Sequence, residues 1–192
     1  MSIRLVAAIG LALGVASTLA TPASARGAID RCYDPQGRPV RVIKSTKVKF
    51  ANVAIAGRDR RGLPYIAYNP NALRRFHPMT RIYIYYHECA HHRLGHSSGH
   101  RPHTRESDAD CWAIRYMVRR GLLNRASLRF IVRDTYSRRG GGVHPAGPVR
   151  ARYIQRCYSY EVQRVAMNNN RRYRGRRGPR TFAQVRLPEF TG

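Results

Sequence analysis

Apolar and polar positions near the start of the chain follow the period of β-structure. The segment 48–57, VKFANVAIAG, alternates loosely and predicts a strand, and LPYIAYNP at 63–70 predicts a second strand. The DRRG between them is typical of a turn, and Asn69-Pro70 ends the second strand. Upstream, residues 26–41 contain the turn cluster DPQGRP. We therefore expect a small N-terminal β-sheet.

The period changes to that of a helix from about Pro78. Apolar and aromatic residues then recur three and four positions apart as far as Leu94, which predicts a helix with one buried face. Residues 95–103 predict a loop. A second helix is expected over 105–120, with Thr104 as its N-cap.

Two more helices are expected in the second half of the chain. Asn124 can cap a helix that runs to about Ser137, and Pro148 can open a last helix that runs to about Met167. The sequence RRGGGVHPAGP breaks the pattern between them. Strands followed by helices favour an α+β fold with a helical C-terminal half.

The first residues predict a secretory signal peptide. Arg4 precedes an apolar run from Leu5 to Ala20, and a cleavage motif of the A-x-A type ends at Ala25. The alternative, an uncleaved anchor, is disfavoured because the run is shorter than the roughly 20 residues that a spanning helix needs. We expect residues 1–25 to be removed, which leaves a secreted or periplasmic protein with no transmembrane segment.

The remaining chain divides into one domain, 26–167, and a tail, 168–192. The tail opens with NNNRRYRGRRGPR, a basic composition with little to bury, and predicts disorder. The whole chain has 36 Lys and Arg against 10 Asp and Glu, a net charge of +26. This charge predicts attraction to anionic envelope polymers or lipids, mainly through the tail. Export makes nucleic acid an unlikely partner.

Four cysteines lie in the predicted mature chain. An even number of cysteines in an exported protein favours disulfides, and no C-x-x-C pair is present to indicate a cysteine zinc site. Of the three possible pairings, we expect Cys89–Cys111 together with Cys32–Cys157. The first would join two segments that should meet at one site, and the second would tie the start of the domain to its last helix.

The stretch YYHECAHHRLGH, residues 85–96, holds four of the eight histidines and one of the four glutamates. His87, Glu88 and His91 form the pattern H-E-x-x-H. Positions i and i+4 share a helix face, so both imidazoles can bind one metal ion, and Glu88 can reach a water in the metal's open position. Zinc suits this chemistry. The alternative is a charged helix with exposed histidines.

A third metal ligand is needed to complete such a site. His96 lies five residues after His91, whereas the metzincin pattern requires six, so that template fails. Glu106 and Asp110 are again i and i+4 on the next predicted helix. Glu106 can bind zinc, and Asp110 can accept a hydrogen bond from a ligand histidine. The alternative is that these acids only complement a helix dipole.

Taken in order, HECAHHRLGH, ESDADCWA and HPAGPVR resemble the gluzincin metallopeptidases, and most of all the HtpX and CAAX-prenyl-protease family. That family has H-E-x-x-H, then an E-x-x-A-D helix, then an H-P element followed by an arginine. The second motif matches Glu106 to Asp110, and the third matches His144-Pro145 with Arg150.

The resemblance implies a zincin-like fold and a soluble, secreted zinc peptidase that acts on peptide or protein substrates. It implies one Zn²⁺ per chain, with Glu88 as the general base. The implied ligands are His87, His91 and Glu106. It also implies that His144 and Arg150 lie beside the zinc, where they polarise the substrate carbonyl and stabilise the oxyanion.

The predicted strand upstream of the histidine helix has a role under this hypothesis. In zincin-like folds an edge strand beside the active helix pairs with an extended substrate. The residues that would line the cleft are Tyr65, Ile66, Ala67 and Tyr68. The alternative is an ordinary core strand. For the whole protein, the alternative function is a basic envelope-binding protein with a degenerate peptidase core, which binds polyanions without catalysis.

Overall fold

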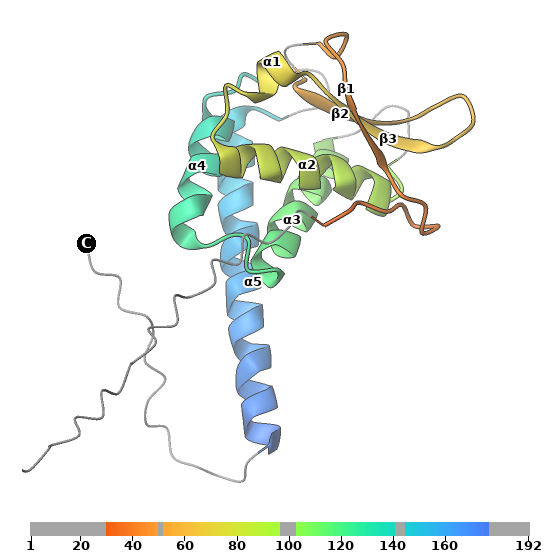
Figure 1. Ribbon diagram of the computed structural model, residues 1–192. Coiled ribbons are helices and arrows are strands. Elements are labelled where there is room, and N and C mark those ends of the chain that lie inside the picture. The colour runs from red at the N-terminus through yellow and green to blue at the C-terminus, as the bar shows by residue number, and fades with distance from the viewer. Residues whose placement is uncertain (1–29, 50–51, 97–102, 141–144, 177–192) are drawn as a thin grey trace, which may run out of the picture.

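The computed structural model describes residues 30–49, 52–96, 103–140 and 145–176. In these ranges a three-stranded sheet precedes a set of helices, which confirms the α+β class (Figure 1). The strands are β1 (Arg41–Lys44), β2 (Ala54–Arg58) and β3 (Pro64–Tyr68). The sheet order is β1-β3-β2, with β1 parallel and β2 antiparallel to β3.

Strand β3 lies in the centre of the sheet. Val42 pairs with Ile66 on one side, and Ala56 pairs with the same residue on the other. The expectation that Tyr65, Ile66, Ala67 and Tyr68 form a substrate-binding edge strand is therefore wrong. It failed because β1, whose four residues are all exposed and show no alternation, was not predicted from the sequence.

Five helices follow the sheet in the described residues. Their bounds are α1 (Pro70–Leu73), α2 (Pro78–Arg93), α3 (His103–Arg119), α4 (Arg125–Tyr136) and α5 (Gly147–Arg176). The predicted cap of α4 is confirmed, since Asn124 and Ser127 form a reciprocal capping box. The predicted N-cap Thr104 is wrong, because α3 begins one residue earlier at His103.

The last helix is longer than expected. Helix α5 continues to Arg176, so the prediction of a structureless tail is wrong for residues 168–176, while 177–192 lie outside the described residues. Figure 1 shows this C-terminal part of α5 extending past the other helices. In the part of the chain that the structure describes, none of the helices combines the length and apolarity that crossing a membrane requires.

Helix α2 is the central element of the fold. It contacts β2 and β3 on one side and α3 and α4 on the other, and α5 packs against α3 and α4 (Figure 1). The apolar core lies between these helices. Its most deeply buried side chains include Tyr86, Ile114, Met117, Ile131 and Ile154. Full burial of one such side chain contributes roughly 1.5–3 kcal/mol, so this core fixes the orientation of α2 against α3.

All four cysteines form disulfides, but not in the expected pairs. The bonds are Cys32–Cys89 and Cys111–Cys157, so the predicted pairs Cys89–Cys111 and Cys32–Cys157 are wrong. Cys89 packs in a small cluster with Cys32, Val40 and Ile66, on the sheet side of α2. Cys111 belongs instead to the core between α3 and α5. The two cysteines of the expected pair thus belong to separate apolar clusters.

Candidate metal centre

Helices α2 and α3 bring the three predicted ligands together. Nε2 of His87 lies 3.2 Å from Nε2 of His91. The carboxylate of Glu106 lies 3.3 Å from His87 Nε2 through one oxygen and 3.5 Å from His91 Nε2 through the other. All three side chains are buried, and they form a group that could hold a metal ion.

The spacing of these donor atoms fits a zinc ion. Ligand atoms about 2.0 to 2.1 Å from a tetrahedral zinc lie about 3.3 Å apart. The three separations in this site, 3.2, 3.3 and 3.5 Å, bracket that value. Two imidazoles and one carboxylate are also a donor set that zinc accepts. A cation at their centre would stabilise three electron-pair donors that otherwise face one another away from water.

Asp110 fixes the orientation of His87. Its Oδ1 lies 2.7 Å from His87 Nδ1, the ring nitrogen that does not face His91 and Glu106, and the Tyr83 hydroxyl donates a hydrogen bond to the same oxygen. A proton on Nδ1 leaves Nε2 with a lone pair that faces His91 and Glu106. Burial by itself would lower the pKa of His87, but Asp110 and Glu106 raise it to about 9. A metal ion that binds Nε2 would therefore displace a proton from it.

Arg150 binds Asp110 from the other side. Its Nε donates to Oδ2 at 2.9 Å and its Nη2 donates to Oδ1 at 2.6 Å. Burial alone would raise the pKa of Asp110, but Arg150 and His87 lower it well below its ordinary value. Arg150 therefore supports His87 through Asp110. Its implied role at the substrate carbonyl stays a prediction, and His144 lies outside the described residues.

The end of α2 places another histidine against the ligands. Gly95 has a φ of +69°, which glycine adopts without strain, and its N–H donates to the carbonyl of His92. The N–H of His96 then donates to the carbonyl of His91, which completes a Schellman motif. This return of the chain sets His96 Nδ1 3.1 Å from His91 Nδ1. This contact was not predicted from the sequence, although a glycine after a predicted helix is typical of the motif.

His92 has a structural contact instead. Its Nε2 lies 2.9 Å from the carbonyl oxygen of Tyr65. This contact joins α2 to the central strand β3. Of the four histidines in the stretch 85–96, two therefore belong to the ligand group, one supports a ligand, and one connects the helix to the sheet.

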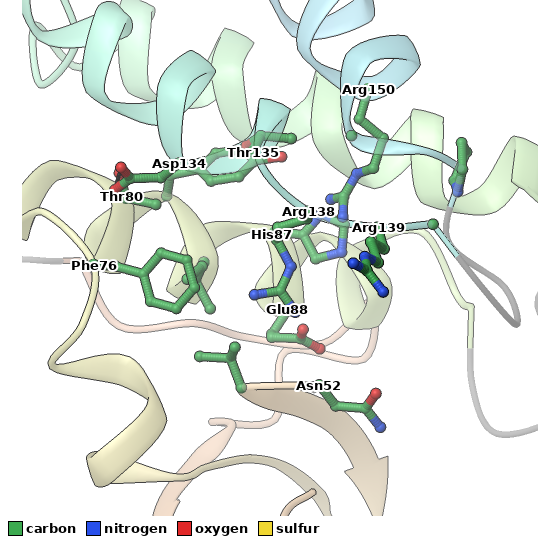
Figure 2. Close-up of a pocket in the computed structure, with 16 residues that line it drawn as sticks. Asn52, Phe76, Thr80, His87, Glu88, Asp134, Thr135, Arg138, Arg139 and Arg150 are labelled. Carbon is green, nitrogen blue, oxygen red and sulfur yellow. Dashed lines mark hydrogen bonds between the residues drawn. The ribbon is translucent and has the colours of Figure 1, made fainter. Parts of the chain in front are cut away.

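Glu88 and His87 open onto a cleft of about 400 Å³. Figure 2 shows the carboxylate of Glu88 directed into this cleft on the side of Asn52. Asn52 and Val53 directly precede β2, and they line the cleft where Tyr65 to Tyr68 were expected to do so. The strand next to the cleft is thus the edge strand β2.

Comparisons of this chain with family models, with curated proteins and with solved structures found no match.

Proposed function

We propose that this protein is an exported zinc metalloendopeptidase of the gluzincin type. The observation that carries the proposal is the convergence of His87, His91 and Glu106 at zinc-ligand spacing, next to Glu88 at the wall of an open cleft. The resemblance of the three sequence motifs to the HtpX and CAAX-prenyl-protease family supports it. Two disulfides fit the oxidising compartment that export would provide.

Three protein ligands are the number found in catalytic zinc sites, where the fourth position serves water or substrate. When bound, zinc would supply Lewis acidity, which polarises a carbonyl and makes water a stronger acid. His87, His91 and Glu106 would hold the ion. Asp110, with Tyr83 and Arg150 around it, would keep His87 in the tautomer that binds metal.

Glu88 would carry the proton in the reaction. It is adjacent to His87 on α2, and it lines the cleft in which a peptide would lie. Its carboxylate would take a proton from the attacking water and deliver it to the leaving amine. His144 and Arg150 would assist at the substrate carbonyl, as the family resemblance implies.

An extended substrate would pair with β2. In the part of the chain that the structure describes, β2 lies at an edge of the sheet beside β3, where an extended peptide would lie along it. Asn52 and Val53, at its start, line the cleft beside Glu88. This assignment replaces the earlier expectation for β3.

Metal analysis of the purified mature protein tests the proposal, with peptide cleavage as the second readout. We expect about one zinc per chain in the wild type, because the described residues hold one such set of three ligands. His91→Ala should lose the zinc. Glu88→Ala should keep the zinc and lose cleavage, because it removes the proton carrier alone. A folded wild type that binds no zinc would contradict the proposal.

The binding function considered above gives a different outcome. A degenerate core that only binds polyanions would cleave no protein substrate, with or without zinc. Its binding to anionic vesicles or polymers would weaken with salt, and it would be unchanged in Glu88→Ala. Cleavage that depends on Glu88 excludes this alternative.

A further inference from the structure

One wall of the cleft is positively charged. Arg138 and Arg139 follow directly on the C-cap of α4, Ser137, and both line the cleft that contains His87 and Glu88. Figure 2 shows the two arginines on the same side of the cleft as His87 and Arg150, with Phe76 and Asn52 around the remaining wall. Guanidinium groups in such a place are suited to carboxylates.

Of the two acidic residues in the same lining, Asp134 is engaged in contacts with its own surroundings. Asp134 accepts hydrogen bonds from the Thr80 hydroxyl at 2.8 Å and from the His77 N–H at 3.1 Å, and Arg133 contacts its other oxygen at 2.9 Å. These contacts hold Asp134 to the start of α2 and to its own helix. Asp134 therefore has a structural role. Glu88 has the proposed role in proton transfer.

The backbone that carries Arg138 is held firmly. The N–H of Arg138 donates to the carbonyl of Thr135 at 3.1 Å, and the N–H of Gly147 donates to the carbonyl of Arg138 at 3.0 Å. A Cβ at Gly147 would collide with the carbonyl oxygens of Thr135, Tyr136 and Arg138. The absence of a side chain there lets the start of α5 close on the end of α4. Arg138 thus extends from a fixed turn, which lowers the entropic cost of binding.

The guanidinium of Arg138 has a second cation and an aromatic ring near it. Arg138 is partly buried, and burial together with the charge of Arg150 lowers the pKa of Arg138. Its guanidinium lies 5.6 Å from the centre of the Phe76 ring, so its planar face is supported by an aromatic side chain. The apolar lining from Val53, Phe76 and Ile84 would accommodate the methylene groups of a glutamate.

From this arrangement we infer that the cleft selects peptides with an aspartate or glutamate next to the bond that is cleaved. Arg138 and Arg139 are the specificity-determining residues, and they disfavour lysine or arginine at the same place. The inference rests on the peptidase function proposed above, and it concerns the substrate class of that site. The overall charge of +26 would attract acidic substrates at long range, but only the cleft arginines select the position.

Cleavage-site profiling by mass spectrometry tests the inference, with a pool of proteome-derived peptides as substrate and the mature chain as enzyme. The variants are Arg138→Gln, Arg139→Gln and the control Arg129→Gln, all with the same change in charge. Arg129 is exposed on α4, packs over Phe130 and does not line the cleft. Zinc content and circular dichroism of each variant show that it is folded.

In the wild type we expect cleavage next to aspartate or glutamate to be about tenfold more frequent than cleavage next to asparagine or glutamine. A tenfold ratio corresponds to the free energy of about one charge-assisted hydrogen bond. The preference should fall to about threefold or less in Arg138→Gln and Arg139→Gln, and should stay within about twofold of wild type in Arg129→Gln. Cleavage without any acidic preference overturns the inference and leaves the peptidase function standing. An equal loss in Arg129→Gln also overturns it, since net charge would then explain the preference.

A binding measurement separates the inference from catalysis. Fluorescent peptides that differ only by glutamate, glutamine or lysine at one position are titrated into zinc-loaded Glu88→Gln protein, alone or combined with each arginine variant. Tighter binding of the glutamate peptide that depends on Arg138 and Arg139 supports the inference even if the wild type cleaves nothing. Equal binding of all three peptides overturns it, whatever the wild type cleaves.

Discussion

Arg150 and Asp110 form a two-point ion pair in the core, with contacts of 2.9 and 2.6 Å, although 40 residues separate them along the chain. The pair stands directly behind the candidate metal centre, because Asp110 also contacts His87 at 2.7 Å. The candidate ligands lie on α2 and α3, and Arg150 connects them to a third helix, α5. The strength of metal binding should therefore depend on residues that do not touch the metal.

Replacement of Asp110 should weaken zinc binding. In Asp110→Asn the carboxylate no longer orients His87, and Arg150 loses its buried partner. We expect zinc affinity to fall by about 10- to 100-fold. We also expect the free energy of unfolding to drop by about 3 kcal/mol, because a buried cation is left uncompensated. Competition with a chelator and denaturant unfolding measure the two effects.

Asp108→Asn is the matched control for this change. Asp108 lies on the same helix, is exposed and carries the same charge. Zinc affinity in Asp108→Asn should stay within about twofold of the wild type, as a surface charge contributes little. A similar loss of affinity in both variants would show that net charge, not the contact with His87, governs the metal.

Gly95→Ala should disturb the metal centre through the Schellman motif. A side chain at a φ of +69° strains the turn that returns His96 to His91. We expect a loss of about 1 kcal/mol in stability, together with weaker zinc binding. Gly62→Ala is the control, since Gly62 has a similar φ of +74° but belongs to the turn between β2 and β3. It should lose stability alone, and equal zinc affinities in the two variants would refute the role of His96.

Each disulfide should contribute strongly to stability. The bonds close segments with sequence separations of 57 and 46 residues, and chain entropy predicts about 4 kcal/mol for each. The double variants Cys32→Ser with Cys89→Ser, and Cys111→Ser with Cys157→Ser, should each unfold at lower denaturant concentration. Peptide mapping without reduction checks the pairing itself, and a Cys89–Cys111 peptide would contradict the structure.

Asp34 should make stability depend on pH in the acid range. Burial by itself would raise the pKa of Asp34, but hydrogen bonds from Arg38 and Arg58 lower it from 3.8 to about 2. A carboxyl with a depressed pKa in the folded state stabilises the fold above its ordinary pKa. That contribution is lost as pH falls from about 4 to about 2.

Urea unfolding between pH 2 and 5 measures this dependence, with Asp34→Asn compared to wild type. The variant should be less stable by about 1 to 3 kcal/mol near neutral pH, because both arginines lose a charged acceptor. Its stability should also change less across the acid range. A curve parallel to that of the wild type would show that other carboxyls set the pH dependence.

The local arrangement of the candidate ligands was predictable from the sequence because it follows helical periodicity. His87 and His91 share a face of α2 through their i and i+4 spacing, and Glu106 and Asp110 share a face of α3 for the same reason. The cap at Asn124 and the α+β order of elements follow equally from short-range patterns. These features need only the backbone geometry of a few neighbouring residues.

The remaining features were decided by packing between segments that are distant in sequence. Cys89 pairs with Cys32 because the side of α2 that carries it faces the sheet, and no pattern in the chain states this direction. Strand β1 pairs with β3, so β3 is central and β2 is the edge strand next to the cleft. Nothing in the sequence distinguishes Arg138 and Arg139 from the other arginines, and only the packing of α5 against the end of α4 places them in the lining of the same cleft as Glu88. Periodicity fixes which residues share a face, whereas only tertiary packing decides what that face meets.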